Sequence, residues 1–164
     1  MRCFRFFGII AIGLFTALFL YPFLHEGGHT LATIFMGEKV YEFQLLPFPF
    51  VTCGLSNENL YEKIVIVGLS GSLFPLLFSF AIYHKNFWLW LVGVYLNTIC
   101  LISFAISIYS CIKFINGISI VNEDITKILE IFPEKATLYL VLFIFLSLLV
   151  IVQMIITNPI QHCR

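Results

Sequence analysis

The residues of this chain best suited to chemistry are two histidines and a glutamate in the segment His25-Glu26-Gly27-Gly28-His29. Residues four positions apart lie on the same face of a helix, so the two imidazoles can bind one Zn²⁺ together. Glu26 lies about 100° further round the helix and can act as general base for a water at the metal. We therefore predict zinc ligands at His25 and His29 and a catalytic carboxylate at Glu26.

The sequence around this segment is almost uninterruptedly apolar. Of the 164 residues, 60% are hydrophobic and 11% are charged, and the mean hydropathy is +1.01. This composition is typical of a polytopic membrane protein, in which ionisable groups inside a membrane segment are costly and by default functional. The alternative, that His25 and Glu26 only hydrogen-bond neighbouring helices, stays open.

Charge and cysteine content exclude several classes of function. The formal net charge is zero and no run of Lys or Arg occurs, so we predict no nucleic-acid partner. The five cysteines are odd in number and lack C-x-x-C spacing, which argues against a disulfide framework.

Four nearly charge-free runs reach the length that a membrane-spanning helix needs, about 20 residues for a hydrocarbon core about 30 Å thick. They predict transmembrane helices at roughly 6–36, 64–83, 87–112 and 136–156. The first run could instead be a signal peptide, but no small-x-small cleavage site follows it. We therefore predict an all-α polytopic membrane protein that forms a single membrane-embedded, metalloprotease-like domain over residues 1–164.

The segment 38–54, after the first helix, begins with partial alternation and is rich in β-branched and aromatic residues. It predicts a short β-strand or a re-entrant loop, and Pro47 and Pro49 restrict part of it to a sheet edge or a loop. An edge strand beside an active site can hold an extended substrate, so we predict substrate contacts at Val40 and Phe43. An amphipathic loop at the membrane interface explains the same composition equally well.

A catalytic zinc usually takes three protein ligands and a water, so a third ligand is needed. We predict Asp124, which follows the third apolar run at the start of a short helical segment with Asn122 as its cap. A carboxylate in the first turn also favours the helix dipole and needs no metal for that. Glu123, Glu58 and Glu62 are rival candidates.

The segment Leu24–Ala32, followed by residues 37–50, resembles the site-2 protease family of intramembrane zinc metalloproteases. The second segment is similar to that family's membrane-embedded β-loop. The resemblance covers roughly residues 6–132, a three-helix protease core in a compact form without regulatory domains, with the fourth apolar run as an addition.

Two weaker motifs extend this resemblance. Gly68–Pro75 is similar to the family's small-residue motif, although Ser72 stands where Asn is usual. Asn116 precedes Asp124 by eight residues, as in the family's third-ligand motif, although Ile125 replaces the usual Gly. The second departure weakens the assignment of Asp124 and leaves the histidine pair untouched.

The resemblance implies a zinc metalloendopeptidase that cleaves membrane proteins in or near their transmembrane segments, which is regulated intramembrane proteolysis. It implies as partners a transmembrane protein substrate, the lipid bilayer and a regulatory membrane protein, in a multi-pass protein of a prokaryotic cell membrane. Asn97, in the third apolar run, is predicted to orient the substrate, or alternatively to hydrogen-bond a neighbouring helix. The alternative function is a catalytically degenerate relative that acts as a binding or escort factor for membrane proteins; a helical scaffold is a third hypothesis.

Overall fold

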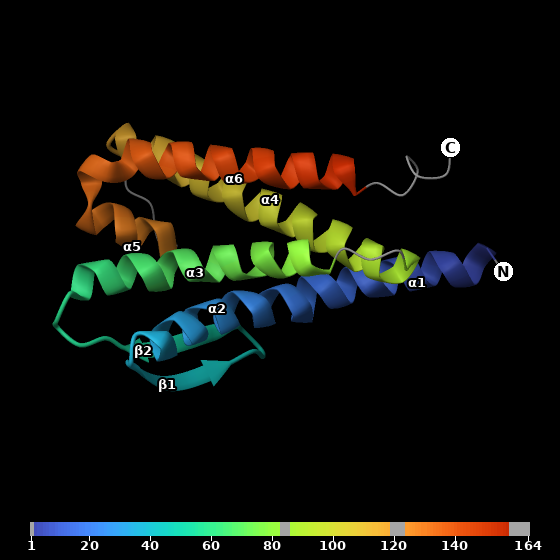
Figure 1. Cartoon of the computed structure of the whole chain (residues 1–164), viewed down its shortest axis with the longest axis horizontal. Helices are drawn as coiled ribbons and strands as arrows, with labels where there is room; N and C mark the ends of the chain where they lie inside the picture. Colours follow the sequence, from blue (N-terminus) through green and yellow to red (C-terminus); the bar gives the residue numbers. More distant parts are fainter. Residues whose placement is uncertain (1, 83–85, 119–123, 158–164) are drawn as a thin grey trace.

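The computed structural model describes residues 2–82, 86–118 and 124–157. These form long helices and one two-stranded sheet (Figure 1). The elements are, in chain order, α1 (Arg2–Phe15), the π-helical turn η1 (Thr16–Leu20), α2 (Tyr21–Phe35), β1 (Lys39–Gln44), β2 (Phe50–Gly54), α3 (Leu60–Ala81), α4 (Phe87–Ile115), α5 (Asp124–Ile131), the 3₁₀ turn η2 (Pro133–Lys135) and α6 (Ala136–Ile156).

Four helical stretches in the described part of the chain are long and apolar enough to cross a membrane. They cover residues 5–35, 60–81, 87–115 and 133–156. Many of the side chains that they expose are large and apolar, Phe15, Leu77 and Phe145 among them. Such surfaces suit contact with lipid, so the chain has the character of a multi-pass membrane protein.

The second spanning helix begins earlier than the apolar run indicated. The run predicted a start near residue 64, whereas α3 begins at Leu60. Its first turn holds Glu62, a favourable charge at a helix amino terminus, and Lys63, whose Nζ donates to Glu38 Oε1 at 2.6 Å. Hydropathy marks the membrane-embedded part of a helix, whereas backbone hydrogen bonding continues through charged turns.

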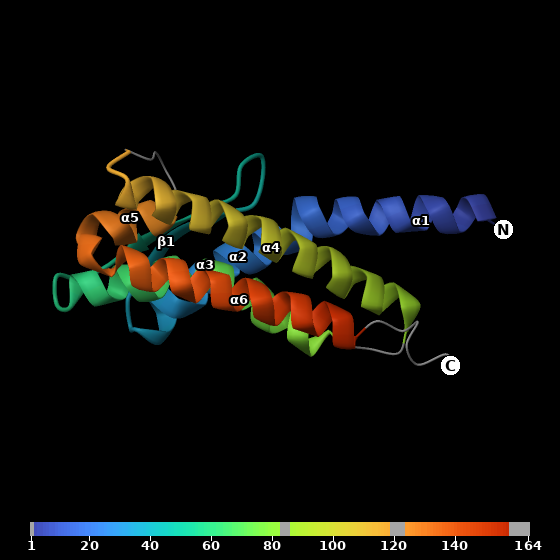
Figure 2. The ribbon, with the colours of Figure 1, turned by 90° about the horizontal axis from the view of Figure 1, so that it is seen from above.

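The first apolar run forms one continuous rod, α1–η1–α2, whose helix widens locally at η1, just before the His25–His29 motif. The backbone N–H of Tyr21 donates to the carbonyl of Thr16, and Pro22, which follows, has no N–H to donate. Figure 2 shows α1 extending past the bundle beside the amino-terminal half of α4. Tyr95 of α4 donates its hydroxyl to the carbonyl of Ile9 at 3.3 Å. Contacts with α4 thus hold the amino-terminal part of the rod, whereas α2 packs directly against α3.

The hairpin between α2 and α3 confirms the strand expected after the first helix. β1 and β2 pair antiparallel, with Lys39 opposite Gly54 and Phe43 opposite Val51. Pro47 and Pro49 lie in the loop between the strands, where no ladder hydrogen bond is required of them. The hairpin packs against α2, so it lies beside the motif (Figure 1).

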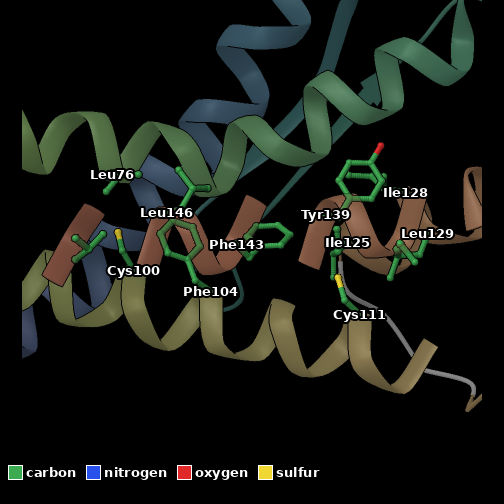
Figure 3. Packing of buried hydrophobic residues seen from close by; sticks show 12 residues of the cluster. Leu76, Cys100, Phe104, Cys111, Ile125, Ile128, Leu129, Tyr139, Phe143 and Leu146 are labelled. Carbon is green, nitrogen blue, oxygen red and sulfur yellow. The ribbon is translucent and has the colours of Figure 1, made fainter. Parts of the chain in front are cut away.

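The main apolar core lies where α3, α4, α5 and α6 meet (Figure 3). Its buried members include Leu76, Cys100, Phe104, Ile128, Leu129, Tyr139, Phe143, Leu146 and Val150. The fourth apolar run, expected as an addition to a three-helix core, supplies the last four of these. In a bilayer such close packing, rather than exclusion of water, holds helices together, so α6 is part of the scaffold that positions α5.

Candidate metal centre

Three side chains from two elements converge on one point. Asp124 Oδ2 lies 3.3 Å from His25 Nε2 and 3.1 Å from His29 Nε2, and the two Nε2 atoms are 3.3 Å apart. The histidines lie one turn apart on α2, whereas Asp124 is the first residue of α5. Among the described residues this is the only group of three such side chains that could hold a metal ion.

The backbone of α3 orients one of the imidazoles. His29 Nδ1 lies 2.6 Å from the carbonyl oxygen of Val67. A carbonyl oxygen only accepts hydrogen bonds, so Nδ1 carries a hydrogen and Nε2 is the ring nitrogen that faces the cluster. A backbone carbonyl in this position is a common second partner of a metal-binding histidine.

Asp124 is held as a carboxylate. Burial raises the pKa of this carboxyl, but hydrogen bonds with His25 and His29 outweigh burial and bring the pKa well below its usual range. The first-turn position on α5 adds the favourable field of a helix amino terminus. The ionised form is the one that binds a cation.

Close approach of α3 to the motif depends on glycines. A Cβ added at Gly71 would overlap His29 Nε2 and would lie 3.0 Å from His25 Cε1, and one at Gly28 would overlap the carbonyl of Ser70. At Gly27, in contrast, no described atom lies within 4 Å of an added Cβ. The small-residue motif Gly68–Pro75 is visible in the sequence, but only the packing shows that Gly71 makes room for both imidazoles.

A cavity of about 570 Å³, here called the strand-side cavity, opens on one side of the cluster. Its walls include Glu26, His29, residues 49–53, Ile64, Val67, Gly68, Asp124, Lys127 and Glu130. Glu26 is 8% exposed, so the predicted general base is buried in the protein yet borders this cavity beside two members of the cluster.

A second cavity, here called the helix-side cavity, has a volume of about 310 Å³ and lies on the His25 side. Its walls include Tyr21, His25, Gly68, Leu69, Ser72, Ile106, Ser107, Asp124, Ile125 and Phe143. Gly68 and Asp124 border both cavities. The cluster therefore lies where the two cavities adjoin.

The predicted substrate contacts on the hairpin lie elsewhere. Val40 and Phe43 belong to β1 and line neither of these two cavities; the ring of Phe43 packs edge-on against Phe23 at 6.3 Å. The strand that borders the strand-side cavity is β2. Partial alternation of apolar and polar residues predicted a strand in this segment, but only packing decides which strand of the hairpin faces the cluster.

The rival carboxylates do not join the cluster. Glu58 is exposed in the loop before α3, and Glu62 lies in the first turn of that helix. Asn122 and Glu123 lie outside the described residues. Of the carboxylates that the structure describes, Asp124 is the one that meets the histidine pair.

Asn97 is also remote from the cluster cavities. It is 3% exposed, and it lines a separate small cavity with Ser79, Trp90 and Gln153. Its Oδ1 has no hydrogen-bond partner within the part of the chain that the structure describes. The substrate-orienting role predicted for Asn97 is therefore not supported by its position.

No protein-family model, curated protein or solved structure matches this chain. The resemblance to site-2 proteases thus remains a prediction from the motifs. The function of the protein is therefore inferred from the geometry of the cluster, the two cavities and the hairpin.

Proposed function

We propose that the protein is an intramembrane zinc metalloprotease of the site-2 type, which hydrolyses peptide bonds in or near transmembrane segments. The observation that carries this proposal is the meeting of His25, His29 and Asp124 at 3.1–3.3 Å on apolar helices, with Glu26 in an adjoining cavity. That the membrane is a prokaryotic cell membrane, and that a second membrane protein regulates the enzyme, stay predictions.

The donor set favours zinc. Three N or O ligands about 2.0–2.2 Å from one zinc, at tetrahedral angles, lie about 3.3–3.5 Å from one another. The separations in the cluster, 3.1–3.3 Å, approach these values. Two imidazoles and one carboxylate are the ligand types of catalytic zinc sites, which keep a fourth position for water or substrate. When bound, zinc would polarise the scissile carbonyl and acidify a water.

The protein's own residues would supply the proton transfers and the orientation. Glu26 borders the strand-side cavity, and in this proposal it takes a proton from the attacking water and passes it to the leaving amine. Val67 fixes the ring of His29 through its carbonyl. Lys127 and Glu130 also line this cavity, and their charged side chains would favour the entry of water.

The strand-side cavity offers a place for an unwound substrate. In a helical substrate the backbone carbonyls are already hydrogen-bonded within the helix. The scissile segment must therefore become extended before it is cut. Among the described residues β2 pairs only with β1, so its other edge is available to a further strand. Because β2 borders the strand-side cavity, we assign it the substrate-pairing role that the sequence analysis gave to β1.

Purified wild type, Glu26→Gln and His25→Ala test the proposal through zinc content and cleavage of a library of synthetic transmembrane peptides. We expect the first variant to keep its zinc and lose cleavage by about 10²–10⁴-fold, and the second to lose both. If wild type contains no zinc even after reconstitution with the metal, the proposed zinc site is wrong, and His25, His29 and Asp124 form only a hydrogen-bonded network. Biological activity unchanged by Glu26→Gln, with no cleavage by either protein, would support the escort alternative.

A further inference from the structure

The helix-side cavity has no role in the chemistry described so far, although it borders the cluster. We infer that it is a specificity pocket, which selects substrates with an apolar side chain beside the scissile bond. This inference rests on the proposed protease function and adds to it the substrate class.

The position of the cavity follows from the walls that it shares. His25 borders the helix-side cavity, whereas His29 and Glu26 border the strand-side cavity, and Gly68 and Asp124 belong to both. A peptide with its scissile carbonyl at the cluster continues in both directions from that point. If the substrate segment on one side of the scissile bond pairs with β2, the first side chain on the other side of that bond meets the helix-side cavity.

The walls of the cavity are chemically selective. Large apolar side chains make up seven of its fourteen lining residues, namely Leu69, Ile99, Ile102, Ile106, Ile125, Ile128 and Phe143. Asp124 is the only carboxylate among its described walls, and it belongs to the cluster, as His25 does. The Ser107 hydroxyl already donates to the carbonyl of Ser103 at 3.1 Å. An uncharged, apolar group such as a Leu, Met or Phe side chain therefore suits this surface.

The size of the cavity agrees with this occupant. Its volume of about 310 Å³ is enough for one large side chain with its adjoining backbone and lies at the small end of ligand pockets, about 300–1,000 Å³. The strand-side cavity is larger, about 570 Å³, and carries Glu26, Lys127 and Glu130. The two sides of the scissile bond thus meet different surfaces, and we expect strong side-chain selection on one side only.

The test alters the volume of the cavity without touching the cluster. Ser107 is 8% exposed, so Ser107→Leu places new atoms inside, whereas Ile106→Ala enlarges the cavity. Ile112 lies on the same helix, is 44% exposed as Ile106 is 45% exposed, and lines neither cavity, so Ile112→Ala is the matched control. Each full-length, zinc-loaded protein is given transmembrane peptides with Ala, Leu, Phe or Asp on either side of the cleaved bond.

We expect Ser107→Leu to reduce cleavage of Leu and Phe peptides relative to Ala peptides by about tenfold or more, at one of the two positions only. Ile106→Ala should shift preference at that same position toward Phe, and Ile112→Ala should behave as wild type. Zinc content should stay that of wild type throughout. Should Ser107→Leu lose zinc through misfolding, the Ile106→Ala profile decides.

Three outcomes overturn the inference. Cleavage by wild type with an unchanged profile in both cavity variants refutes the specificity pocket while leaving the protease intact. A fall in co-purified phospholipid with Ser107→Leu, without a change in profile, identifies a site for a lipid chain instead. Zinc-loaded wild type that cleaves no peptide refutes the proposed function itself, and the specificity pocket with it.

Discussion

Two polar sites interrupt the apolar interior, and they differ in kind. The cluster of His25, His29 and Asp124 joins α2 to α5, beside Val67 and Gly71 in the middle part of α3. The second site, here called the amide cavity, lies near the ends of α3 and α6 and is lined by Ser79, Trp90, Asn97 and Gln153 among others. In the described structure Trp90 Nε1, Asn97 Oδ1 and Gln153 Oε1 are buried there without a partner.

The difference shows that geometry, more than polarity, distinguishes a reactive site in a membrane protein. At the cluster, three ligand atoms lie within 3.3 Å of one another, and one of them belongs to a carboxylate. In the amide cavity the groups are neutral, donors and acceptors are mixed, and the volume is about 10 Å³, the space that one water needs. The first arrangement suits a cation, whereas the second suits a structural water.

Removal of a cluster ligand should have the largest effect. We expect Asp124→Ala to reduce bound zinc from about one per chain to none, because two protein ligands seldom retain a catalytic zinc. The matched control is Glu58→Ala with Glu62→Ala, two carboxylates outside the cluster; Asn97→Ala should also keep its zinc. Mass spectrometry of purified protein measures the zinc, and full zinc in Asp124→Ala would contradict the assigned third ligand.

The next effect should come from the glycine that faces the cluster. Gly71→Ala places a methyl group against both imidazoles, so we expect zinc affinity to fall by about 10–100-fold, as for other changes that misorient metal ligands. Gly27→Ala, on the open side of α2, is the control and should bind zinc as wild type does. Competition with a chelator measures both. Equal affinities would mean that α3 does not position the histidines.

A change in the amide cavity should alter stability without altering zinc content. Asn97→Leu removes one member of the shared polar site and leaves Gln153 and Trp90 buried beside an apolar side chain, at an expected cost of about 1–3 kcal/mol. Asn97→Leu combined with Gln153→Leu should recover part of this cost, because fewer polar groups are then left unpaired. Denaturant unfolding in detergent measures both variants, and a neutral single change would contradict the proposed water site.

The smallest effect concerns Glu38 at the base of the hairpin, which lies outside the membrane-spanning segments and pairs with Lys63 in the first turn of α3. Hydrogen bonds from Lys63 and Ser56 lower the pKa of Glu38 from 4.5 to about 2. A carboxyl whose pKa is lowered by folding stabilises the fold at pH values above its usual pKa. This contribution is therefore complete above pH 4.5 and is lost as the pH falls toward 2. Protease sensitivity of the hairpin across this pH range measures it.

The pH dependence should be weaker in Glu38→Gln, while Glu42→Gln, which changes an exposed residue of the same hairpin, should keep it. Zinc content above about pH 7 should be the same in both, because neither residue touches the cluster and an ordinary histidine, with a pKa of about 6.5, is mostly neutral there. Identical pH profiles in wild type and Glu38→Gln would mean that the ion pair does not hold the hairpin.

The sequence by itself determined the local features of this protein. Apolar runs of sufficient length predicted four helices, because a bilayer demands that length and that composition. The spacing of His25 and His29 predicted a shared face, because one helical turn relates them. Partial alternation, with β-branched and aromatic residues, predicted a strand segment after the first helix, which the hairpin bears out.

Only the tertiary structure decided which distant groups meet. Sequence left Asp124 beside Glu123, Glu58 and Glu62 as possible third ligands, because the route of the chain from α2 to α5 depends on the packing of α3, α4 and α6. The same packing brings β2 rather than β1 to the cavity, sets Gly71 against the imidazoles and carries Asn97 away from the cluster. Helical periodicity acts over one turn, whereas these contacts depend on the summed fit of whole helices.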